Sequence, residues 1–321
     1  MSTAESLNII DCTIRDGGLV NQWNFGVEFV SRLYETLNQA RVEYMEIGYR
    51  NSPELVGEVG IGPWRFCEEK VIRKAVPVKK STKLSVMVDI GKFYVNEIPP
   101  KDESIVDLVR VACYSSQIEE AIGAINDLHV KGYETALNIM AISRVNETEL
   151  RQQLYKVRSS KVDIVYIVDS FGSLYMDDIN RLTKIYKRSL PGKQIGIHAH
   201  NNLQLAFANT ITANQAGCRF MDSTVYGMGR AAGNCPTELL IGYLYPKYNI
   251  KPILKAIEEL FIPLRELEEW GYLIPYALSG QLNEHPRTAI ELRNQTEAKD
   301  NYLEFYEQTT KDKDRPLQVA R

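Results

Sequence analysis

The chain has 321 residues, 44% of them hydrophobic and 25% charged, with a formal net charge of −3. This length allows one large core plus a smaller appendage, and the small net charge does not favour nucleic acid or an anionic membrane as a partner. The five cysteines form no CxxC pair and no stretch approaches about 18 uninterrupted apolar residues, so we expect a cytoplasmic protein without disulfides or membrane segments.

Eight short apolar or β-branched segments recur along the first three quarters of the chain. Between most of them lie segments with apolar residues at helical spacing, most clearly 27–40, 116–130 and 202–217. Eight strand–helix units predict an α/β fold of the closed (β/α)8 type, the TIM barrel. The expected strands are 7–14, 42–48, 83–91, 106–114, 135–143, 163–170, 194–200 and 219–227.

Residues 51–82 are less regular than the rest of this pattern. We expect a long loop after the second strand, followed by a helix that includes the basic segment 71–80. Long loops after barrel strands often contact substrate. Trp64, Arg65 and Phe66 are candidates for such contacts, and a packed lid is the alternative.

The strand pattern stops after Tyr248. Helical segments at 252–270 and 287–308 take over. We therefore divide the chain into a TIM-barrel catalytic domain, 1–248, and a helical extension, 249–321. The extension could cover the barrel mouth as a lid or form a contact between two subunits.

Two distant segments carry metal-ligand chemistry, DCTIRDGG at 11–18 and IHAHNN at 197–202. His198 and His200 are two residues apart, so in a strand both imidazoles leave the same face. Asp16 could be the third ligand. Two imidazoles and a carboxylate bind a divalent cation and leave coordination positions open, as a Lewis-acid catalyst requires. A wet amphipathic strand is the alternative explanation for the two histidines.

Barrel closure makes the last strand the neighbour of both the first and the seventh. The first and seventh strands then lie roughly 10 Å apart, which one ion can bridge at the C-terminal face of the barrel. Asn234 follows the last strand and could add a neutral oxygen ligand or a hydrogen bond to one of the ligands, or it could cap the helix after it. The glycines at 227, 229 and 233 suggest a tight or flexible loop and are only a weak phosphate signal.

Arg15 precedes the candidate ligand Asp16, and a guanidinium beside a dication suits stabilisation of an enolate oxygen. An ion pair with Glu46 or Asp169 is the alternative. Polar residues in other strands are candidates for substrate binding, although each could instead orient Arg15, hold an imidazole or satisfy a buried neighbour. They are Glu46, Arg110, Asn138 and Asp169.

The ordered motifs DCTIRDGG, LVRVACY, VYIVDSFG, GIHAHNNLQLA and GMGRAAGNCPTEL resemble the metal-dependent carbon–carbon lyase and synthase barrels. This superfamily includes 4-hydroxy-2-oxovalerate aldolase, 3-hydroxy-3-methylglutaryl-CoA lyase and 2-isopropylmalate synthase. The resemblance covers about residues 7–245, and the motif spacing most resembles the 4-hydroxy-2-oxovalerate aldolase branch. It implies Asp16, His198 and His200 as metal ligands, Asn234 as a further ligand and Arg15 as the enolate-stabilising residue. The implied chemistry makes or breaks a carbon–carbon bond beside a carbonyl through a metal-bound enolate.

The chain departs from that branch where its general base should lie. A histidine follows the RDG motif in those aldolases, but this chain has Gly18 and Leu19. His285, in the extension, could replace it as the catalytic base, with Tyr226 and Tyr276 as other proton carriers. For His285 a surface position before a helix is the alternative. Further along, Asn21 and Trp23 could shape a different substrate pocket.

The first hypothesis is therefore an aldolase acting on a 2-oxo acid such as pyruvate and an aldehyde. A Claisen-type synthase that uses an acyl-CoA and an inactive scaffold barrel are alternatives, and a facial-triad oxygenase is a more distant one. The expected cofactor is a divalent cation, Mn²⁺ before Co²⁺, Zn²⁺ or Mg²⁺. A homo-oligomer is expected, and the resemblance suggests an aldehyde dehydrogenase as a partner.

Overall fold

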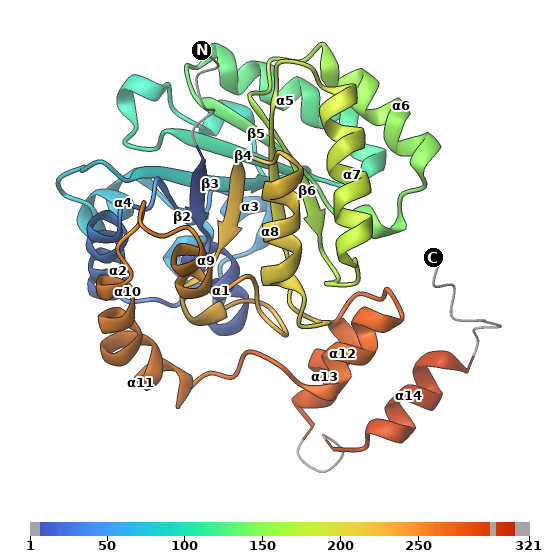
Figure 1. Ribbon diagram of the computed structural model, residues 1–321. Coiled ribbons are helices and arrows are strands. Elements are labelled where there is room, and N and C mark those ends of the chain that lie inside the picture. The colour runs from blue at the N-terminus through green and yellow to red at the C-terminus, as the bar shows by residue number, and fades with distance from the viewer. Residues whose placement is uncertain (1–6, 296–299, 312–321) are drawn as a thin grey trace.

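Eight parallel strands close into a barrel in the order β1-β2-β3-β4-β5-β6-β7-β8, with β1 paired to both β2 and β8 (Figure 1). The structure is a computed structural model that describes residues 7–295 and 300–311. The predicted TIM barrel is thus confirmed. The strands are β1 (Asn8–Asp11), β2 (Tyr44–Tyr49), β3 (Lys83–Asp89), β4 (Leu108–Cys113), β5 (Glu134–Ile139), β6 (Ile164–Asp169), β7 (Gln194–Ala199) and β8 (Phe220–Ser223).

Helices surround the barrel and continue into the extension, with short 3₁₀ turns in several loops. The helices of the barrel part are α1 (Thr13–Asn21), α2 (Val27–Ala40), α3 (Pro53–Val56), α4 (Glu69–Ala75), α5 (Ile118–Val130), α6 (Glu147–Arg158), α7 (Met176–Ser189), α8 (Ala206–Ala216) and α9 (Thr237–Tyr243). Those that follow are α10 (Lys251–Ala256), α11 (Ile262–Arg265), α12 (Ile274–Gln281), α13 (Arg287–Arg293) and α14 (Tyr302–Thr310).

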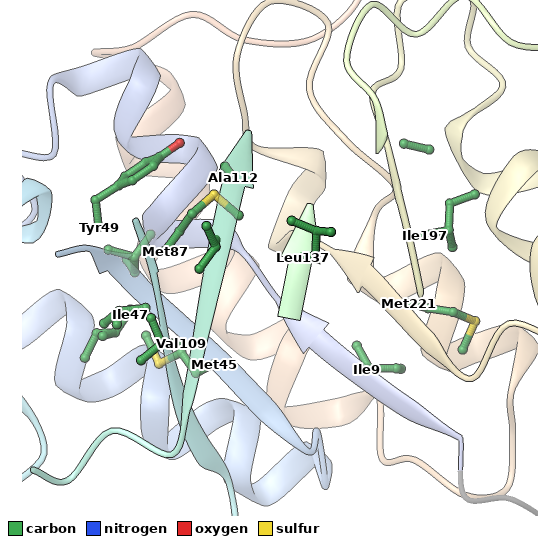
Figure 2. Close-up of a cluster of buried hydrophobic side chains, with 14 of the residues drawn as sticks. Ile9, Met45, Ile47, Tyr49, Met87, Val109, Ala112, Leu137, Ile197 and Met221 are labelled. Carbon is green, nitrogen blue, oxygen red and sulfur yellow. The ribbon is translucent and has the colours of Figure 1, made fainter. Parts of the chain in front are cut away.

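Side chains of each strand alternate between the barrel interior and the layer beneath the helices. Figure 2 shows part of the outer layer, where Met45 comes from β2, Val109 from β4 and Leu137 from β5. The inner layer instead contains apolar residues such as Tyr166 and Phe220 together with polar ones. Because of this alternation, the charged residues of the strands meet inside the barrel.

Several predicted elements differ in extent from the observed ones. The first strand ends at Asp11, and the rest of the predicted strand 7–14 is the start of α1. The helix predicted over 202–217 begins only at Ala206. The helix predicted over 252–270 is interrupted by a π turn at Ile257–Phe261, just before Pro263, which lacks the N–H that a regular turn needs.

The extension is also less continuous than expected. The segment 287–308 forms two separate helices, α13 and α14, and residues 296–299 between them lie outside the described part. Figure 1 shows α12, α13 and α14 together at the end of the barrel where α1 lies. Among the described residues, no helix has both the length and the apolar character needed to cross a membrane.

Candidate metal centre

The chain turns from β1 directly into α1 at the barrel mouth. Asp11 Oδ1 accepts the backbone N–H of Thr13 at 3.1 Å, and its Oδ2 accepts the hydroxyl of Thr237 at 3.0 Å. These bonds fix the start of α1, so Arg15 and Asp16 lie in its first turn. The predicted strand 7–14 is therefore wrong beyond Asp11, and helical spacing sets the directions of Arg15 and Asp16.

Asp16, His198 and His200 each offer a ligand atom, and the three atoms lie within 4.8 Å of one another. All three residues are buried. His198 Nε2 and His200 Nδ1 are buried, and among the described residues they have no hydrogen-bond partner. Buried polar atoms are nearly always paired, so these two nitrogens indicate a ligand between them. The predicted convergence of two distant segments is confirmed, and this donor set fits a divalent cation.

His198 is oriented by Asp222 on β8, whose Oδ2 lies 2.9 Å from Nδ1. This contact places the proton on Nδ1 and leaves the Nε2 lone pair for a cation. Burial would lower the pKa of His198, but the carboxylates of Asp16 and Asp222 raise it above its ordinary value. Burial lowers the pKa of His200 well below its ordinary value, which keeps that imidazole neutral.

Asp16 is held in its ionised form. Burial alone would raise the pKa of its carboxyl group, but the nearby Arg15 and the two imidazoles bring it well below the usual range. Asp16 Oδ1 also accepts the backbone N–H of Arg230 at 3.1 Å. Asp16 is therefore an anionic donor before any cation binds.

Asn234 contacts the same carboxylate. Its Nδ2 donates to Asp16 Oδ1 at 2.9 Å, and its Oδ1 is buried without a partner among the described residues. The capping alternative is wrong, since α9 begins after Pro236 and has no side-chain cap. A Cβ at Gly229 would lie 2.1 Å from Asn234 Nδ2, so this glycine permits a close approach to the ligand cluster.

Arg15 makes two short ion pairs, from Nε to Glu46 Oε2 at 2.6 Å and from Nη1 to Asp16 Oδ2 at 2.5 Å. The predicted alternative of an ion pair with Glu46 is thus confirmed, but the two pairs leave one nitrogen of the guanidinium without a partner among the described residues. Nη2 is buried and has no partner in the described part of the chain. Arg15 therefore keeps a donor available beside the candidate ligands.

Three of the predicted substrate-binding residues bond to protein groups inside the barrel. Arg110 Nη2 donates to Asp222 Oδ2 at 2.6 Å, its Nη1 lies 3.3 Å from Glu46 Oε2, and its Nε donates to Asn138 Oδ1 at 3.4 Å. This network orients Arg15 and His198, which was one of the predicted alternatives. Direct substrate binding by these residues stays a prediction. A second cluster, Cys12 with His198 and Asp222, is blocked for cations by the guanidinium of Arg110.

Asp169 lies at the end of β6 and accepts the backbone N–H groups of Ser173 at 3.0 Å and Leu174 at 3.2 Å. Burial raises the pKa of its carboxyl group to about 6 against the effect of these bonds. The contacts fix the loop after β6. A pair with Arg15 is not among the contacts of the described residues, and a role in substrate binding stays a prediction.

The long loop after β2 supplies one charged side chain to the mouth. Trp64 is fully buried and donates to the Phe25 carbonyl, so it belongs to the packing alternative. The guanidinium of Arg65 lies 4.5 Å from the ring centre of Trp23 and 4.2 Å from that of Tyr49. Phe66 is partly buried.

Trp23 explains the departure from the RDG-histidine pattern. A Cβ at position 18 would lie 2.0 Å from Trp23 Cδ1, so only glycine fits there. The indole of Trp23 donates to the carbonyl of Arg15 at 2.9 Å, and Leu19 is 41% exposed. Asn21, in the last turn of α1, has a buried Oδ1 without a partner among the described residues.

One residue, Arg230, lies between His285 and the ligand cluster. His285 Nε2 is 3.1 Å from Arg230 Nη1, and its Nδ1 faces the backbone N–H of Arg287 at 3.1 Å. A neutral imidazole carries one proton, so only one of these contacts is a hydrogen bond at a time. Burial and the nearby arginines lower the pKa of His285 to about 4.

The two tyrosines predicted as proton carriers lie in packed surroundings. Tyr226 packs edge-on against Trp270, and Tyr276 is fully buried in the cluster that joins α12 to α13 and α14. Sequence reasoning missed Asp222 and Arg230. Asp222 shares its strand parity with the inward Phe220, a signal that could have found it, while Arg230 stands inside the motif GMGRAAGN without a distinguishing pattern.

A model of the HMGL-like family matches residues 6–256. A 4-hydroxy-2-oxovalerate aldolase from Geobacillus thermodenitrificans is 32% identical over 246 residues, which are 76% of this chain and 71% of that protein. An oxaloacetate decarboxylase from Mycobacterium tuberculosis is 27% identical over 236 residues, 74% of this chain and 69% of that protein. The N-terminal domain of a candidate aldolase from Bacteroides vulgatus superposes with a TM-score of 0.77 at 28% identity, covering 92% of this chain and 99% of that one.

Proposed function

The chain belongs to the HMGL-like family, and on that premise we propose that it is a divalent-metal-dependent aldolase that acts beside the carbonyl of a 2-oxo acid such as pyruvate. The observation that carries this proposal is the buried cluster of Asp16, His198 and His200, in which two imidazole nitrogens have no partner among the described residues. Relatives named as aldolases favour it over the acyl-CoA synthase and the inactive scaffold.

The proposed cation is held by Asp16, His198 and His200, with the Oδ1 of Asn234 as a further donor. When bound, a divalent cation withdraws electron density from the keto oxygen of the substrate and so lowers the free energy of the enolate. Two nitrogens with one or two oxygens suit Mn²⁺ first, and also Co²⁺, Zn²⁺ and Mg²⁺.

Arg15 has the second role in this proposal. Its unpaired Nη2 can donate to an oxygen on which negative charge develops, while Glu46 and Asp16 hold the rest of the guanidinium in place. The donor needs no reorientation during the reaction because both ion pairs are buried. Arg15 thus stabilises the enolate after the carbon–carbon bond breaks.

In the cleavage direction a base takes the hydroxyl proton of a 4-hydroxy-2-oxo acid. The C3–C4 bond then breaks, its electron pair passes to the enolate, and the aldehyde leaves. We propose His285 as that base, since its imidazole is neutral and lines the mouth beside Arg230. Its low pKa makes it a weak base, so it assists a reaction that the cation and Arg15 drive.

The test is exchange of the C3 protons of pyruvate for deuterons, followed by NMR with each of the four metals. We expect exchange that depends on added metal and is lost in Asp16→Asn. Exchange that is equal without metal, or that survives Asp16→Asn, would refute the proposal. Thiol release from acetyl-CoA in the presence of 2-oxo acids would instead support the synthase alternative.

A second candidate is decarboxylation of a 2-oxo dicarboxylic acid. The exposed Leu19 and the glycine forced by Trp23 leave no base where the aldolases have one, and loss of CO₂ produces the same enolate without deprotonation. The similarity to an oxaloacetate decarboxylase points the same way. CO₂ release from oxaloacetate above the rate with metal alone would support it. An aldehyde dehydrogenase partner and a homo-oligomer stay predictions.

A further inference from the structure

The extension and the barrel rim form an open cavity of about 940 Å³. Its barrel wall comes from the loops that follow β4, β5 and β6, and its other wall comes from α13 and α14. This volume lies near the upper end of the range for small-molecule sites and is far larger than a two-carbon aldehyde requires. The cavity is therefore large enough to bind a molecule larger than acetaldehyde.

The cavity is connected to the candidate metal centre through His285 and Arg230. His285 lines it and contacts the guanidinium of Arg230, whose backbone N–H donates to Asp16. Arg230 Nη2 also donates to the carbonyl of Ser170 at 2.6 Å, which holds the side chain across the boundary. A molecule in the cavity can therefore contact His285, and Arg230 links that end of the cavity to the carboxylate of Asp16.

The wall formed by the extension is fixed to the barrel. Asn283 Oδ1 accepts the hydroxyls of Ser143 at 2.7 Å and Ser173 at 2.9 Å, which follow different strands. Arg144 Nη2 donates to the Asn283 carbonyl at 2.8 Å and pairs with Glu284 at 2.7 Å. The segment before α13 is thus bound to two barrel loops, which gives the cavity a defined shape.

The lining indicates the chemistry of the occupant. Four carboxylates and two guanidiniums face the cavity, so a phosphorylated or CoA-linked ligand meets an unfavourable charge. Arg287, Thr288 and Glu291 on α13 are exposed and present hydrogen-bond donors and acceptors to the cavity. Phe171 and Phe305 add apolar faces beside these donors and acceptors. Hydroxyl groups with C–H faces between them match this mixture.

We propose that this cavity binds the acceptor of the reaction and that the acceptor is an uncharged polyhydroxylated aldehyde of about four to six carbons. The inference rests on the proposed aldolase function and adds the substrate class to it. The aldehyde carbon lies toward Arg230 and His285, and its hydroxyls bond to the side chains of α13. The extension thereby sets the acceptor preference of the enzyme.

Kinetics with pyruvate and three aldehydes test the proposal: erythrose, acetaldehyde and erythrose 4-phosphate. We expect a kcat/KM for erythrose at least tenfold above that for either of the other two. Thr288→Trp and Gln308→Trp fill the cavity and should raise the KM for erythrose at least tenfold, with kcat/KM for acetaldehyde within twofold. Leu303→Trp, on the same helix as Gln308 but 72% exposed and outside the cavity, is the matched control and should change neither value.

A wild-type enzyme that prefers acetaldehyde or erythrose 4-phosphate would overturn the proposal, as would equal losses with erythrose and acetaldehyde in the tryptophan variants. A tenfold loss in Leu303→Trp would also contradict it, because that loss would not depend on the cavity. Two measurements separate its failure from failure of the aldolase function. Pyruvate C3 exchange reports the function without any acceptor, and NMR saturation transfer to erythritol reports occupation of the cavity without turnover. Erythritol should bind the wild type and not Thr288→Trp.

Discussion

The barrel mouth has two sides that satisfy their polar groups differently. On the side of β1, β7 and β8, charged residues are almost fully buried and bonded to each other, and ligand atoms of Asp16, His198 and His200 lie within 4.8 Å of one another. On the side of β4, β5 and the extension, side chains line an open cavity and several of them are exposed. We propose that the first arrangement holds a cation rigidly and that the second leaves space for a variable substrate.

This difference separates chemistry from specificity. A substitution in a buried ionic network strongly lowers stability, since removing one charge leaves its partner uncompensated. A solvent-accessible lining tolerates substitutions with small effects on stability. We therefore expect changes on the metal side to abolish turnover for every acceptor and changes on the extension side to alter the choice of acceptor.

The largest effect should come from His198→Asn. Loss of an imidazole ligand should weaken metal binding at least 100-fold and lower pyruvate exchange about 1,000-fold. Metal competition titrations and NMR exchange measure the two effects. His129→Asn, an exposed histidine on α5, is the control and should match the wild type. Metal affinity within threefold of wild type in His198→Asn would contradict the proposed ligand set.

Arg15→Lys should lower the exchange rate about 100- to 1,000-fold with metal affinity within tenfold of wild type. Lysine keeps the positive charge beside Glu46, but it has no counterpart of the unpaired Arg15 Nη2 that donates to the enolate oxygen. Single-turnover exchange at saturating metal measures this effect. An equal loss of metal affinity and exchange would instead assign Arg15 to holding Asp16.

His285→Asn tests the extension side of the comparison. Cleavage of a 4-hydroxy-2-oxo acid should fall about 100-fold, and pyruvate exchange should stay within threefold, since exchange needs no proton from an acceptor hydroxyl. Because the pKa of His285 is lowered to about 4, its imidazole stays neutral and able to accept a proton down to about pH 5. Unchanged cleavage in this variant would remove His285 as the base.

Asp222→Asn should weaken metal binding about 10- to 100-fold. The amide no longer stabilises the Nδ1 proton of His198 and leaves Arg110 without one carboxylate. Calorimetric titration with Mn²⁺ measures the change, and Tm reports folding separately. If Asp222→Asn lowers Tm but leaves metal affinity intact, Asp222 serves the barrel interior alone.

The smallest effect concerns stability. Burial raises the pKa of Asp11 from 3.8 to about 7, so its protonated form is favoured in the folded state. Its contribution to stability is full below about pH 4 and is lost as pH rises toward 7. The free energy of unfolding of Asp11→Asn relative to wild type should therefore rise by about 2–4 kcal/mol from pH 5 to pH 8. Urea unfolding at both pH values measures this; a difference between the variants that is the same at both pH values would contradict it.

Some of this organisation could be predicted from the sequence because it depends on local pattern. The alternation of strands and helices predicted the barrel, and the spacing of His198 and His200 predicted their common direction. The position of Asp16 followed from barrel closure. Its helical setting did not, since residues 12–14 have the β-branched character of a strand and only the bonds of Asp11 show where α1 begins.

The sequence by itself determined the type of fold and the candidate ligands, because periodicity and residue chemistry are local properties. Only the tertiary structure decided that Asp222 orients His198, that Trp23 leaves no room for a side chain at position 18, and that α13 and α14 form one wall of a cavity lined by His285. The first of these contacts joins residues 24 positions apart, and the contact of Ser143 with Asn283 that attaches the extension joins residues 140 apart, so no local pattern encodes them.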